Sequence, residues 1–212
     1  MRRVSAVHRI AAALGCALLI GGVAAAPGAA QDGQGPSGCM DYEPHRQFDF
    51  WLGDWNVYAM NGGFAGRNTI ERGAQGCVLH EHWRSASGGT GHSLNFVDPR
   101  TGRWRQIWTG TNHVIDYDGG LNARGQMILT GEITYFDAEG ARELAFRGAW
   151  TPQADGAVIQ HFQQWDPEGE QWTRWALLTY VPAETDPNGR EPGADATGPV
   201  IERAPDAFDP RD

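Results

Sequence analysis

The sequence predicts an all-β protein, an antiparallel up-and-down β-barrel of about ten strands with a short helical plug at its N-terminal end. Three observations support this prediction. The stretch Phe48–Tyr58, FDFWLGDWNVY, is too aromatic for a surface helix. After it, turn signals rich in Gly, Asn and Asp recur at short intervals, and the runs between them alternate apolar and polar residues. No helical periodicity interrupts these runs.

The aromatic stretch is expected to form a helical turn that closes one end of the barrel and leads into the first strand. Gly53 allows a sharp backbone turn just before Trp55, where alternation begins. The expected strands are 55–59, 67–72, 77–84, 91–97, 103–109, 113–121, 126–136, 142–151, 157–165 and 172–181. Short connections favour pairing between sequence neighbours, and closure into a barrel removes exposed edges. A two-sheet sandwich is the alternative architecture.

Residues 1–30 have the pattern of a signal peptide. Arg2, Arg3 and Arg9 precede an apolar run, and the segment has no acidic residue. The signal peptide is expected to direct the protein across a membrane, to the periplasm or the exterior, and to be cleaved after Ala30. The mature chain is not expected to insert into a membrane. Cleavage removes three arginines and shifts the formal net charge from −9 to −12, which disfavours nucleic acid and anionic membranes as partners.

The mature chain is expected to consist of a flexible leader (31–44), one barrel domain (45–181) and an acidic tail (182–212). The tail is rich in Pro, Gly, Asp and Glu and poor in large apolar residues, a composition typical of disorder. Cys39 and Cys77 remain after cleavage. In an exported protein such a pair predicts a disulfide, which would join the leader to a central strand.

A trial register of the central hairpins assigns one face to the barrel interior. Placing Trp83 opposite His92 puts Glu81 opposite Leu94, and the next hairpin then places Trp108 opposite His92. This face contains several side chains suited to bind a small apolar or aromatic molecule: Glu81, Trp83, His92, Trp104, Gln106 and Trp108.

Two further histidine patterns leave alternatives open. His80 and His82 lie two apart on one strand, so they are either two exposed side chains or part of a metal site, and no metal is assigned. His161 either points inward as a ligand-binding residue or lies on the outer face. Glu81 is either a structural carboxylate paired with Arg147, Arg174 or a tyrosine hydroxyl, or a carboxylate in an aromatic cavity, where desolvation raises its pKa. An enzyme that uses Glu81 or His161 as general acid or base is therefore the alternative to a binding protein.

The motif Gly53-Asp54-Trp55, at the start of an antiparallel meander, resembles the Gly-x-Trp signature of lipocalins and the wider calycin group. The resemblance implies a basic residue late in the barrel that packs over Trp55, and Arg174 is the best match, with Arg147 as the alternative.

More narrowly, the segments FDFWLGDW, GCVLHEHW and SLNFVDPRTGRWRQIW resemble a family of uncharacterised exported bacterial proteins with calycin-like barrels. That family implies no activity. The number of strands also resembles the nitrobindin branch, which implies haem bound through His161 as a further alternative; no other cofactor is expected.

Overall fold

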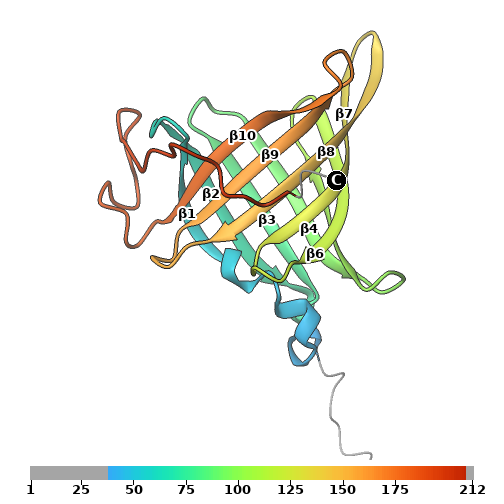
Figure 1. The fold of residues 1–212 in the computed structure, drawn as a ribbon. Coiled ribbons are helices and arrows are strands. Elements are labelled where there is room, and N and C mark those ends of the chain that lie inside the picture. Colours follow the sequence, from blue (N-terminus) through green and yellow to red (C-terminus); the bar gives the residue numbers. More distant parts are fainter. Residues whose placement is uncertain (1–37, 209–212) are drawn as a thin grey trace, which may run out of the picture. The chain divides into compact units, whose positions relative to one another are not determined.

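The computed structural model describes residues 38–208, so the expected signal peptide lies outside the described residues. Ten antiparallel strands form one closed barrel in which each strand pairs with its sequence neighbours and β1 pairs with β10 (Figure 1). This confirms the predicted fold class. The strands are β1 (Gly53–Ala59), β2 (Phe64–Gly73), β3 (Val78–Ser85), β4 (Thr90–Asp98), β5 (Arg103–Thr109), β6 (His113–Leu121), β7 (Met127–Asp137), β8 (Gly140–Pro152), β9 (Val158–Asp166) and β10 (Gln171–Pro182).

The N-terminal plug consists of three short 3-10 helices, η1 (Cys39–Asp41), η2 (Glu43–Arg46) and η3 (Asp49–Trp51). Phe48 and Trp51 are fully buried, and their rings stack at a centroid distance of 4.9 Å. The Phe48 ring also meets Trp104 and Trp150 edge-on, at 5.6 and 5.3 Å. Aromatic side chains therefore fill the end of the barrel that the plug covers, as the sequence predicts.

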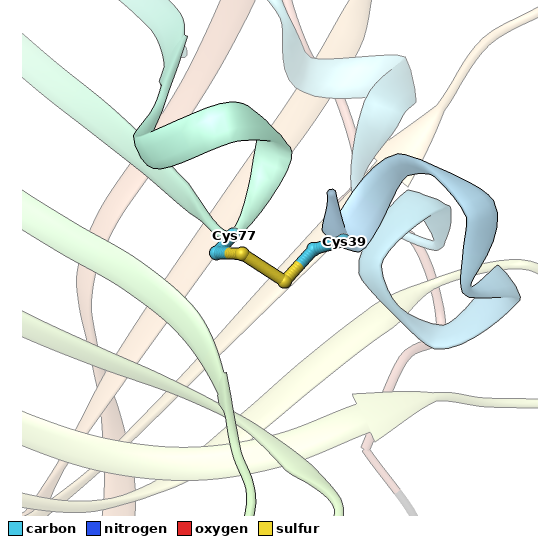
Figure 2. Close-up of a disulfide and its surroundings, with 2 residues drawn as sticks. All are labelled: Cys39 and Cys77. Carbon is cyan, nitrogen blue, oxygen red and sulfur yellow. A yellow bond between two sulfur atoms is a disulfide. The ribbon is translucent and has the colours of Figure 1, made fainter. Parts of the chain in front are cut away.

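The predicted disulfide between Cys39 and Cys77 is present, with the two Cα atoms 4.9 Å apart. Cys39 belongs to η1, and Cys77 follows the short turn η4 (Ala74–Gly76) that connects β2 to β3 (Figure 2). The bridge therefore attaches the plug to the loop at the same end of the barrel. Within residues 38–208, no helix has the length and apolar character needed to cross a membrane.

Residues 183–208 follow the outside of the barrel (Figure 1). They belong to the segment whose composition is typical of disorder. The Asp186 carboxylate accepts hydrogen bonds from Asn56 Nδ2 at 2.8 Å and from the Tyr58 hydroxyl at 2.5 Å. Further along, the Ile201 amide donates to the Met60 carbonyl, and the Phe208 ring lies 5.4 Å from the His161 ring. These contacts bury part of the outer surface of β1 and β9.

The trial register of the central hairpins is wrong by one residue. His92 pairs with His82 and Thr109, Glu81 pairs with Ser93, and Leu94 pairs with Ile107. Because side chains alternate between the two faces of a strand, the slip exchanges the faces of β4 but leaves β3 and β5 as predicted. The inward residues of β4 are therefore Gly91, Ser93, Asn95 and Val97, and His92, Leu94 and Phe96 face outward.

Candidate ligand-binding cavity

A cavity of about 150 Å³ lies in the half of the barrel farther from the plug. Its walls are mostly aromatic and apolar, and its polar groups come from the middle of the strands. The lining residues are Glu81, Trp83, Gln106, Trp108, Ile115, Tyr117, Gln160, Phe162, Trp175, Leu178 and Tyr180. A dry cavity of about this size accommodates a benzene-sized molecule.

Three tryptophans lie at the open end of this cavity. Trp83 and Trp108 come from the ends of β3 and β5, and Trp175 comes from the start of β10. The Trp108 Nε1 donates a hydrogen bond to His113 Nε2 at 3.2 Å, and the Trp175 Nε1 donates to the Tyr135 hydroxyl at 2.9 Å. The indole N–H groups of Trp108 and Trp175 are therefore held by residues at the barrel rim.

The hydrogen bond from Trp108 requires a neutral His113 ring that carries its proton on Nδ1. Its Nε2 accepts from Trp108, while its Nδ1 lies 3.1 Å from Asn112 Oδ1 and donates to it. Burial lowers the pKa of His113 below its usual value, so the ring is neutral at neutral pH. A protonated ring could not accept the Trp108 hydrogen bond.

Below the tryptophans, a belt of buried polar side chains crosses the barrel from β9 to β6 by way of β10 and β2–β5. Each member is at most 4% exposed, and the members are Gln160, Tyr180, Asn68, Glu81, Ser93, Asn95, Gln106 and Tyr117. Every neighbouring pair in this order is hydrogen-bonded. The cavity therefore has an aromatic mouth and a polar floor.

Glu81 is the ionisable carboxylate of this belt. Its Oε1 accepts a hydrogen bond from Asn68 Nδ2 and its Oε2 accepts one from the Ser93 hydroxyl, both at 2.6 Å. Burial raises the pKa of Glu81 to about 7, although both hydrogen bonds favour the charged form and oppose the shift. Glu81 therefore changes its protonation state near neutral pH.

The residues predicted to bind a ligand lie in three different places. Glu81, Trp83, Gln106 and Trp108 line the cavity. Trp104 lies in the plugged half instead, where its Nε1 donates to the Pro44 carbonyl at 3.0 Å. His92 faces outward, and its Nδ1 lies 3.1 Å from Nδ1 of His82.

His161 also faces outward, because its neighbours Gln160 and Phe162 face the cavity. It is nevertheless buried, since the tail places Phe208 against it. This position does not fit haem bound in the barrel through His161. Within the described chain, no group of three or more His, Cys, Asp or Glu side chains is arranged to hold a metal ion.

The prediction that Arg174 packs over Trp55 is wrong. Trp55 pairs with Pro182 at the plugged end of β10, and Arg174 lies eight positions away along that strand, about 25 Å at the rise of a β-strand. The Trp55 Nε1 instead donates to the Trp51 carbonyl at 3.0 Å, and its ring packs edge-on against Tyr180. Arg147, the alternative, stacks over Trp172 on the outer face of the barrel.

Sequence reasoning missed Trp175 and most of the polar belt. A register shift between Arg174 and Ala176 leaves Trp175 without a partner on β9, and Trp175 lines the cavity although alternation counted back from Leu178 and Tyr180 would place it outside. Asn68, Ser93 and Asn95 had no distinguishing signal, because a one-residue slip places them outside. Tyr117 and Tyr180 could have been found by extending the inward face of β5 and β3 around the barrel.

Comparison with models of known protein families gives no match, and comparison with curated proteins gives no similar protein.

Proposed function

We propose that this protein is an exported binding protein that holds a small, largely apolar or aromatic molecule in its barrel. The observation that carries the proposal is the arrangement of the cavity, with three tryptophans at the mouth and a hydrogen-bonded polar floor that includes Glu81. Pockets that bind small molecules combine apolar walls with a few fixed polar groups in this way. The volume of about 150 Å³ favours a guest about as large as one six-membered ring.

The floor would orient the guest rather than react with it. Glu81 is hydrogen-bonded to Asn68 and Ser93, and the two histidines predicted to bind a ligand, His92 and His161, face away from the cavity. A general acid or base must lie within hydrogen-bond reach of the proton that it transfers, and no histidine lines the cavity to relay a proton to or from Glu81. The raised pKa of Glu81 is the observation that favours the enzyme alternative, in which this residue alone carries the proton.

Binding can be tested by native mass spectrometry and by fluorescence titration. Protein purified from its own host should retain a small mass, and titration with toluene or phenol should change the tryptophan emission saturably. Trp108→Ala should weaken this binding about tenfold or more, because it removes a cavity wall. The control is Trp165→Ala, because Trp165 packs with Trp172 outside the cavity. No retained mass and no saturable binding would refute the proposal, and consumption of a retained molecule would favour the enzyme.

Export is supported by the pattern of residues 1–30 and by the disulfide, a bond typical of oxidising compartments. Intact-mass measurement of the protein from fractionated host cells tests this part. A mature N-terminus at Gln31, outside the cytoplasm, is the expected result. A full-length chain in the cytoplasm with reduced Cys39 and Cys77 would contradict it.

A further inference from the structure

On one side of Glu81, the hydrogen bonds of the polar belt run toward its carboxylate. Tyr117 donates to Gln106, Gln106 to Asn95, Asn95 to Ser93, and Ser93 to Glu81 Oε2. From the other side, Asn68 donates to Glu81 Oε1 and to the Tyr180 hydroxyl. A chain of donors that points at a carboxylate stabilises its charged form. The donors beside Glu81 therefore favour its ionised form, in opposition to burial, which disfavours it.

This carboxylate has no cationic partner in the described chain. Its two donors are neutral, and no arginine within residues 38–208 forms an ion pair with it. Two arginines at inward positions contact other groups: Arg72 pairs with Asp49 beside the plug, and Arg142 stacks over Tyr135 at the rim. Buried charges in proteins are normally paired, because desolvation of an isolated ion is costly.

Glu81 also has spare acceptor capacity. An ionised carboxylate offers about four lone pairs, and the two hydrogen bonds occupy two of them. Next to it, the buried amide oxygen Oδ1 of Asn68 has no hydrogen-bond partner. Because Glu81 lines the cavity, a guest that brings positive charge there would supply the counter-charge that this carboxylate lacks.

Two of the tryptophans at the mouth lie against glycines of the barrel wall. A Cβ atom added at Gly91 would overlap the six-membered ring of Trp108. One added at Gly66 would come too close to Cη2 of Trp83. Each ring therefore lies close to the backbone of the barrel wall. The N–H group of Trp108 already donates to His113, so the ring can contact a guest through its apolar atoms.

We infer that the guest of this cavity is a small organic cation, a protonated amine or a quaternary ammonium. The inference rests on the proposed binding function and specifies the ligand class. Glu81 provides the counter-charge, and the indoles of Trp83, Trp108 and Trp175 provide the electron-rich faces that attract a cation. The net negative charge of the chain adds a long-range attraction for such a ligand.

The test compares charged and neutral molecules of the same shape by isothermal titration calorimetry at pH 8, where Glu81 is ionised. Choline is compared with 3,3-dimethylbutan-1-ol, and benzylamine with benzyl alcohol. Each cation should bind at least about tenfold more tightly than its neutral partner. Glu81→Gln should remove most of this preference, measured as the ratio of the two affinities for each pair of molecules. Glu132→Gln, an exposed carboxylate on β7, is the matched control and should leave this ratio unchanged.

If Glu81→Gln does not fold, the wild-type protein still decides the question. Choline keeps its charge at every pH, so its affinity should increase as pH rises through the range in which Glu81 ionises. Equal binding of charged and neutral partners would overturn the cation inference and leave the binding function intact. If neither cation binds but toluene or phenol does, the inference again fails and the function stands. If none of these molecules binds, both fail.

Discussion

Ser93 donates a hydrogen bond from its hydroxyl to Oε2 of Glu81 at 2.6 Å, across paired positions of β3 and β4. This contact exists because the register places Ser93, and not Leu94, opposite Glu81. It connects the carboxylate to the part of the belt that continues through Asn95, Gln106 and Tyr117. The charge state of the cavity floor therefore depends on this pair.

Ser93→Ala should raise the pKa of Glu81 further above its usual value, because the lost hydrogen bond favours the charged form. It should also lower the free energy of unfolding by about 1–3 kcal/mol, since a buried acceptor loses its donor. NMR titration of the Glu81 side-chain carboxyl and urea unfolding measure the two effects. Ser87→Ala, in the exposed loop after β3, is the control and should change neither. An unchanged Glu81 titration would contradict the described contact.

Stability should depend on pH through Glu81. The folded-state pKa is about 7 and the usual value is 4.5, so between these values the folded protein binds more protons than the unfolded chain. The contribution of Glu81 to the free energy of unfolding is therefore largest at low pH and falls as pH rises from about 4.5 to about 7. At 1.36 kcal/mol for each pKa unit, the loss is roughly 3 kcal/mol.

This dependence is measured as the difference between the wild-type protein and Glu81→Gln in urea unfolding at pH 5 and pH 8. The neutral glutamine removes the titration, so the difference should change by most of that amount between the two conditions, because pH 5 already lies slightly above the usual value of 4.5. Tyr117 and Tyr180 face Glu81, and burial raises the pKa of both well above 10, so they stay neutral throughout. A difference that does not vary with pH would show that Glu81 titrates normally.

Gly91→Ala should disturb the mouth of the cavity. A Cβ at this position would overlap the Trp108 indole, so the ring must move away from the wall. We expect a loss of about 1–3 kcal/mol in the free energy of unfolding and a shifted tryptophan emission. Gly120→Ala, on β6, is the matched control because nothing lies within 4 Å of its added Cβ. Equal stability of the two variants would mean that the Trp108 ring does not lie against Gly91.

Removal of the disulfide in the double variant Cys39→Ser, Cys77→Ser should destabilise the barrel by about 4 kcal/mol. The bridge spans 38 residues, and the estimate follows from the loop-closure entropy that it removes from the unfolded chain. Urea unfolding of the variant, and of the wild-type protein with and without reductant, measures the effect. The reduced wild-type protein should match the variant. Unfolding midpoints that coincide under all three conditions would show that the bridge does not stabilise the plug.

The sequence by itself determined the architecture. Strict alternation of apolar and polar residues, together with turn residues at short intervals, specifies antiparallel neighbours, and the density of aromatic residues around Trp51 specifies a buried plug. These signals are local, so they can be read along the chain. The inward faces of β3 and β5 could also be predicted, because the alternation of Leu79, Glu81 and Trp83, and of Trp104, Gln106 and Trp108, favours one face.

The tertiary structure alone decided which polar groups meet in the cavity. The register of β4 could be read either way, because both of its faces mix polar and apolar residues, and a slip of one residue exchanged His92 for Ser93. The irregularity at Trp175 and the burial of His161 under Phe208 depend on contacts with other strands and with the tail. Alternation specifies that a strand has two faces, but only closure of the barrel fixes which residues of different strands lie side by side.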